Sequence, residues 1–112
     1  MEIAPIRHLM TAIVQEQDVD LVERALSTLH VPVIHLASTG GFLGRRNATL
    51  LIGLPDGLER EVQAALLKSC RQRIEYLAVP LEGAPLPLPT PVPVTVGGAT
   101  VFTLPVERFE EV

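Results

Sequence analysis

An α+β fold built on one antiparallel sheet is predicted by the order of apolar patterns along these 112 residues. A strand pattern, an amphipathic helix pattern and a second strand pattern follow one another up to residue 36, and the same succession is repeated up to residue 79. Two such units interleaved in one sheet, with both helices on one face, give the split βαβ sandwich of ferredoxin-like folds. The length and an apolar content of 47% fit a single domain over residues 1–112.

The first unit begins with residues 6–15, IRHLMTAIVQ, whose branched apolar side chains are typical of a strand. Asp18 stands where an N-cap is expected, and apolar residues then recur at helical spacing until His30. Residues 31–36 predict a second strand, in which Pro32 is compatible with the strand's start or with an edge position.

The second unit has a strand at residues 48–53, then a helix, then a strand at residues 74–79. Asp56 and Glu59 have the spacing of a capping box, so Asp56 is expected to cap this helix. Cys70, the one cysteine of the chain, is interpreted as a small buried side chain at the helix end.

Proline dominates the next segment, because six of the fourteen residues from 80 to 93 are proline. Proline lacks the N–H group that a ladder needs, so this segment is expected to be a long extended loop outside any regular sheet. Gly97 and Gly98 lie between two strand patterns, residues 92–96 and 100–104, and predict a C-terminal β-hairpin. The last eight residues predict a short terminal helix with Val106 and Phe109 facing inward.

Charge and cysteine usage argue against several classes of protein. A net charge of −4 argues against binding to nucleic acid polymers, which requires excess positive charge. No run approaches the roughly 20 apolar residues of a membrane span, and the N-terminus lacks the pattern of a signal peptide. We therefore expect a cytoplasmic protein with no membrane insertion and, with its lone cysteine, no internal disulfide.

An oligomer is predicted by the excess of apolar residues. The mean hydropathy of +0.34 is high for a domain that is too small to cover much of its own surface. The strands at residues 6–15 and 48–53 are apolar on both sides, so the sheet face opposite the helices is also expected to be buried. A second subunit is the simplest cover for that face.

No constellation for catalysis or metal binding is visible in the sequence. It offers no nucleophile with a nearby base and no paired carboxylates outside helix starts, and His8, His30 and His35 lack the spacing of metal ligands. We therefore expect neither enzyme activity nor a metal or cofactor.

Residues 39–47, TGGFLGRRN, contain the parts of a nucleotide site. Glycines allow backbone N–H groups to face an anion, and Arg45 and Arg46 supply charge for phosphate. Phe42 offers a ring face to a base, and Asn47 can hydrogen-bond an adenine edge. A turn with solvated arginines explains the same composition, and the spacing excludes a P-loop and a GxGxxG motif.

Several runs in this order resemble the PII-like cyclic-di-AMP receptor family. They are residues 13–15 (IVQ) followed by an acidic helix start, residues 36–43 (LASTGGFL), residues 47–53 (NATLLIG) and residues 96–102 (VGGATVF). The resemblance implies a homotrimer of ferredoxin-like subunits with one ligand site in each cleft between neighbours. It also implies a short ligand loop, residues 39–47, and a longer loop near the ligand, which falls on residues 80–93.

The resemblance also implies site residues. Three loop residues would wrap the ligand, an asparagine would contact adenine, a small residue would let the ligand lie close, and the hairpin would contribute an aromatic ring. In chain order these are Gly41, Phe42, Leu43, Asn47, Gly53 and Phe102.

The second strand departs from the family pattern. Pro32 and Ile34 stand where members often carry a basic residue and a threonine, and His35 replaces the usual lysine. The resemblance thus implies a ligand-facing position for Ile34 that lacks the usual polar contact. Either Arg45 or Arg46 replaces the missing charge, or both merely face water.

Two functions are compatible with these residues. The first is a signalling protein that binds cyclic-di-AMP between subunits and rearranges its two loops, which changes a surface read by an unnamed downstream protein. The alternative is a trimeric interaction module that binds another adenine nucleotide or no nucleotide.

Overall fold

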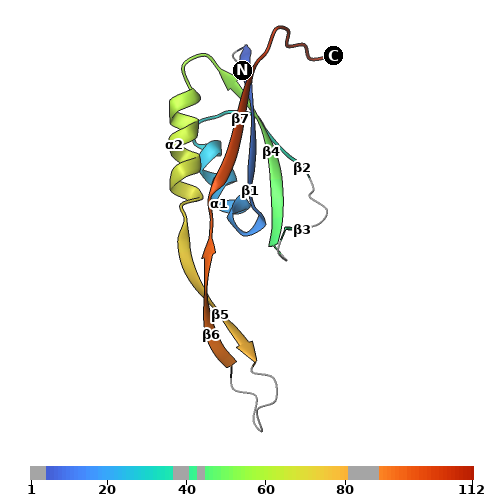
Figure 1. Cartoon of the computed structure of the whole chain (residues 1–112). Helices are drawn as coiled ribbons and strands as arrows, with labels where there is room; N and C mark the ends of the chain where they lie inside the picture. The colour runs from blue at the N-terminus through green and yellow to red at the C-terminus, as the bar shows by residue number, and fades with distance from the viewer. Residues whose placement is uncertain (1–4, 37–40, 43–44, 81–88) are drawn as a thin grey trace.

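The computed structural model describes residues 5–36, 41–42, 45–80 and 89–112. Figure 1 shows a compact body, formed by the helices and most strands, and a long two-stranded extension. The elements are β1 Ile6–Gln15, the short 3-10 helix η1 Glu16–Asp18, α1 Val19–Ser27, β2 Val33–Leu36, β3 Gly41–Phe42, β4 Arg45–Pro55, α2 Glu59–Ser69, β5 Arg73–Pro80, β6 Pro89–Val96 and β7 Ala99–Pro105. No helix in these ranges is long and apolar enough to cross a membrane.

The main sheet has the strand order β2-β4-β1-β7, and the short β3 pairs with the start of β4. All of its pairs are antiparallel, with nine residue pairs between β1 and β4 and seven between β1 and β7. Two helices and an antiparallel sheet confirm the predicted α+β class and are consistent with a small ferredoxin-like fold.

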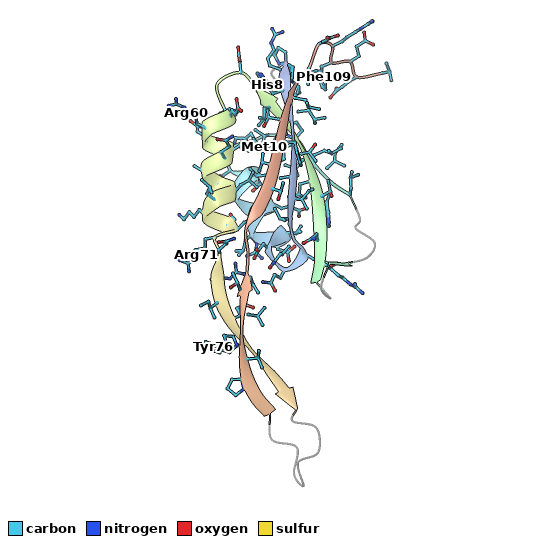
Figure 2. All side chains as sticks on the ribbon, viewed as in Figure 1. His8, Met10, Arg60, Arg71, Tyr76 and Phe109 are labelled. Atoms are coloured by element: carbon cyan, nitrogen blue, oxygen red, sulfur yellow. The ribbon has the colours of Figure 1, made fainter. Side chains whose placement is uncertain are left out.

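The core lies between this sheet and the two helices, which cover the same face (Figure 1). Alternate residues of β1 and β4 point into it, because successive side chains of a strand face opposite sides. Met10, labelled in Figure 2, is fully buried among them. The buried set is Met10, Ala12 and Val14 of β1, Ala48, Leu50, Ile52 and Leu54 of β4, Val19, Val22 and Leu26 of α1, and Val62 and Leu66 of α2, with Val31 and Cys70.

The fourth strand of the sheet is not the one predicted. The segment predicted at residues 74–79 does form β5, but β5 pairs with β6 in a separate two-stranded sheet. Residues 99–105 form β7 and take the place beside β1 instead. Both segments have a strand pattern, and such a pattern does not specify which neighbour a strand will pair with.

The prediction that residues 80–93 stay outside any ladder is wrong for their described part. Pro80 and residues 89–93 lie in the β5–β6 pair. The prolines at 89, 91 and 93 alternate with other residues, and alternate residues of an antiparallel pair direct their N–H groups to opposite sides. Since β6 pairs only with β5 among the described strands, prolines of one parity are tolerated on its open side.

The predicted C-terminal hairpin and terminal helix are not formed. β6 and β7 flank Gly97 and Gly98 as expected, but they belong to different sheets. Residues 106–112 form neither helix nor strand, and the ring of Phe109 is 46% exposed (Figure 2). A helix this short needs a packed apolar face, and nearly half of Phe109 stays exposed.

We call the β5–β6 sheet the arm. A partly buried ion pair connects it to the body. Arg73, the first residue of β5, approaches the Asp18 carboxylate with an Nη2–Oδ1 distance of 2.8 Å. The Asp18 side chain is fully buried and that of Arg73 is 28% exposed. Their hydrogen bond raises the pKa of the Arg73 guanidinium further above its ordinary value.

Neither predicted side-chain cap is found at the start of the two helices. Asp18 is the N-cap residue of α1, but its side chain makes no cap hydrogen bond and serves Arg73 instead. Helix α2 has Leu58 at its N-cap rather than Asp56.

Removal of Arg73 should destabilise the chain more than removal of both partners. Arg73→Met leaves a buried carboxylate uncompensated, and we expect it to lower the free energy of unfolding by roughly 3 kcal/mol. The double variant Asp18→Asn/Arg73→Met should lose less, since no buried charge remains. Urea unfolding of both variants and the parent measures this, and a double variant as unstable as Arg73→Met would contradict the interpretation.

Cys70 should be inert in the folded protein. The side chain is buried, and desolvation, with a smaller contribution from Asp18, raises its pKa from 9.0 to about 11. The folded state therefore binds the thiol proton more tightly; this stabilises it fully below pH 9.0, and the contribution is lost as the pH rises toward 11. A chromogenic disulfide reagent at pH 8 should react with the thiol only after denaturant is added. Rapid reaction without denaturant would show an accessible thiolate.

Candidate functional site

The face of the main sheet opposite the helices is uncovered in the single chain. Residues of β1 and β4 that alternate with the core residues lie on it, including Thr11, Ile13 and Leu51, all partly exposed. The edges of this face carry large apolar side chains with high exposure: Ile34 59% and Leu36 43% on β2, Phe102 57% and Leu104 59% on β7. We call this surface the open face.

A polar hollow of about 280 Å³ lies where the open face meets the root of the arm. Asn47 and Gln15, at paired positions of β4 and β1, form one side of it. Gly97 and Gly98, between β6 and β7, form another. Ile13, Val14, Gln72, Ala99 and Thr100 complete the lining.

Backbone geometry at Gly97 and Gly98 shapes the hollow. Both residues have φ +91°, in the left-handed region that favours glycine. A Cβ atom on Gly97 would collide with the backbone carbonyl oxygen of Arg71. The Gly97 N–H donates to Gln15 Oε1 at 2.8 Å, and the Gly98 N–H donates to the Cys70 carbonyl at 2.5 Å. These contacts fix the passage from the arm into β7.

The structure brings Asn47 into this hollow but spreads the other predicted residues over the open face. Ile34 pairs with Leu51, and Leu51 and Phe102 both pair with Thr11, so these four residues form one row across the sheet. Ile34 and Phe102 thus lie on opposite edge strands, with β4 and β1 between them.

Gly53 lies six residues beyond Asn47 on β4, or about 20 Å along the strand. In the single chain the space beside Gly53 is taken by its own neighbours, because a Cβ there would lie 2.9 Å from Pro32 Cγ and 3.1 Å from Ile6 Cδ1. A ligand contact at Gly53 stays a prediction.

The predicted short loop is partly a hairpin. Gly41 and Phe42 form β3 and pair with Arg46 and Arg45 at the start of β4. Arg46 is exposed and has the opposite parity to Asn47, so its side chain is directed away from the open face. Leu43 and the side chains at 41, 42 and 45 lie outside the described residues.

Sequence reasoning missed Gln15, Gly97, Gly98 and Gln72 as lining residues. Gln15 belongs to the family-like run of residues 13–15, but that run gave it no role in a site. Its place in the hollow follows from register, because Gln15 ends β1 directly opposite Asn47. Gly97 and Gly98 were read as a hairpin turn, which hid their place beside β1.

The hollow offers neutral hydrogen-bonding groups rather than catalytic ones. Its lining contains amide side chains, one hydroxyl and backbone groups, with no carboxylate, histidine or cysteine among the described residues that form it. No cluster of three or more metal-ligating side chains occurs in the described ranges. Such a surface suits recognition of a polar ligand.

Comparison with known proteins decides the family. The model of the cyclic-di-AMP receptor family matches residues 7–112, nearly the whole chain. The chain belongs to the cyclic-di-AMP receptor family. The chain is also similar to the crystal structure of a functionally unknown protein from Pediococcus pentosaceus, with 34% sequence identity and a TM-score of 0.75 over 97% of this chain and 100% of the other.

Gly97→Ala should cost more stability than Gly57→Ala. Both glycines have positive φ, but a Cβ on Gly57 meets nothing within 4 Å whereas one on Gly97 meets the Arg71 backbone. We expect a loss of about 1 kcal/mol for Gly57→Ala from backbone strain alone and about 3 kcal/mol for Gly97→Ala. Chemical unfolding of both variants tests this. Equal losses would mean that the passage at Gly97 adjusts freely.

Proposed function

We propose that this chain is a receptor for cyclic-di-AMP, which it binds in clefts between the subunits of a homotrimer. The observation that carries the proposal is the position of Asn47: the family's asparagine lines a polar hollow at the margin of an exposed apolar sheet face. Membership of a receptor family and the neutral lining favour binding over enzymatic turnover.

The size of the hollow supports a site shared between subunits. About 280 Å³ is at or below the ~300–1,000 Å³ of ordinary small-molecule pockets, so one chain holds only part of a dinucleotide there. Asn47 would pair with an adenine edge, and Phe102, 57% exposed on β7, would lie against a base. Backbone amides around Gly41, with Arg45, would face the phosphates, since Arg46 is directed away from the open face.

The open face supports the trimer. Ile34 and Leu36 at one edge of the open face, and Phe102 and Leu104 at the other, expose large apolar areas. Such exposure is unfavourable in water and is relieved by association. Three chains of 12.1 kDa would give a particle of about 36 kDa. The arms would then lie outside the apolar centre.

Signalling would proceed through the two loops. Gln15, Gly97 and Gly98 place the hollow at the root of the arm, and the arm carries the proline-rich segment of residues 80–93. Ligand contacts with residues 39–47 and with the arm's root would shift the arm's position, and a downstream protein would recognise the change.

A trimeric module that binds another adenine nucleotide or none is the second candidate, and one observation favours it. The space beside Gly53, which a family ligand would use, is filled by Pro32 and Ile6 of the same chain. Ile34 also offers no hydrogen bond from the neighbouring strand.

Titration of the purified protein with cyclic-di-AMP should show saturable binding of one ligand per subunit by calorimetry. ATP, cyclic AMP and cyclic-di-GMP should bind far more weakly. Asn47→Ala removes hydrogen bonds to the base, worth about 1–3 kcal/mol, so it should weaken binding roughly 10- to 100-fold. Gln63→Ala, an exposed amide on α2, is the matched control and should leave the affinity unchanged.

Light scattering on the same samples measures the mass. A well-folded trimer that binds another adenine nucleotide, or none, would establish the second candidate and overturn the receptor proposal. A monomer at micromolar concentration would contradict both candidates, because each requires a trimer.

A further inference from the structure

Gln15 occupies two environments at once. Its side chain is partly buried at the end of β1, where it lines the polar hollow opposite Asn47 and also contacts the root of the arm. Gln15 and Asn47 are directly opposite each other in the β1–β4 pair, and opposite residues have Cβ atoms about 4.5–5.5 Å apart. The two side-chain amides can therefore reach one ligand together.

The contact with the arm fixes which way the Gln15 amide faces. The Gly97 N–H can only donate, so the atom 2.8 Å away must be the carbonyl oxygen, Oε1. Gln17 Nε2 donates to the same oxygen at 3.4 Å. Gly97 cannot shift easily, because its left-handed backbone is packed against Arg71. The Gln15 amide is therefore held with its oxygen engaged and its NH₂ group free to donate.

Within the described part of the chain, Gln15 Nε2 donates no hydrogen bond of its own. We propose that Gln15 is a specificity-determining residue of the ligand site, which presents its NH₂ group to a hydrogen-bond acceptor of the bound nucleotide. The inference rests on the proposed function. Asn47 can satisfy both a donor and an acceptor of an adenine edge, whereas Gln15, with its oxygen occupied, selects for an acceptor: a ring nitrogen or a phosphate oxygen.

A purely structural role is the competing explanation, in which Gln15 serves only to accept from Gly97. Gln15→Glu separates the two roles. A carboxylate keeps the shape and the acceptor for the Gly97 N–H, but it replaces the NH₂ donor with a second acceptor. The structural role survives this change and the ligand contact does not.

Cyclic-di-AMP titrations of the parent, Gln15→Glu and Gln17→Glu test the inference. Gln17 is exposed on η1 beside Gln15, so Gln17→Glu introduces the same charge a few ångströms away without altering the hollow's lining. We expect Gln15→Glu to keep the parent's melting temperature within about 2 °C and to bind at least roughly 30-fold more weakly, since a lost donor leaves an acceptor unpaired. Gln17→Glu should bind within about threefold of the parent.

A second measurement needs no variant that must fold. The side-chain NH₂ signals of Gln15 in ¹⁵N-labelled parent protein should shift on saturation with cyclic-di-AMP, while those of exposed Gln63 should not.

The outcomes are distinguishable. Three results would each overturn the inference and leave the receptor function intact. Gln15→Glu could bind cyclic-di-AMP with the parent's affinity, or Gln17→Glu could lose as much affinity as Gln15→Glu. The NH₂ signals of Gln15 could also stay unmoved at saturation. A folded parent that binds no cyclic-di-AMP would overturn the proposed function itself.

Discussion

Antiparallel pairing of β1 with β4 is the interaction on which the rest of the structure depends. Nine residue pairs place the apolar sides of two strands in register, and the side that contains Met10, Ala12, Leu50 and Ile52 becomes the floor of the helix-covered core. Because side chains alternate strictly, the same register also decides which residues face away from the helices. A shift by one residue would remove Asn47 from the open face along with the buried set from the core.

The arm depends on a second, polar set of contacts. β5 and β6 bury few described side chains, so they are held to the body at their root by the Asp18–Arg73 ion pair and by hydrogen bonds from Gly97 and Gly98. Directional contacts of this kind fix an orientation that apolar packing alone would leave free. Gly97 and Gly98 also border the polar hollow, so the place proposed for a ligand lies beside one of the points where the arm is anchored.

A single chain supplies only part of the proposed binding site. Its hollow has room for part of a dinucleotide, and the open face with its exposed apolar side chains adjoins that hollow. Association over the open face would cover the apolar side chains and build a second wall for the ligand in one step. Under the proposed function, burial of the sheet face and completion of the ligand cleft are therefore the same event.

Local pattern determined where elements lie: apolar periodicity placed β1, α1, β4 and α2, although β4 is longer than predicted and α1 ends at Ser27 rather than near His30. Short motifs in the sequence pointed to the family, whose model matches residues 7–112. Periodicity states which sides of a strand are apolar but not which strand lies beside it. Tertiary structure alone decided that β7 rather than β5 completes the sheet, that alternating prolines fit the open side of β6, and that Gln15 lies opposite Asn47. The physical reason is that strand pairing joins backbone groups far apart along the chain, so the partner is chosen by the whole fold and not by the residues nearby.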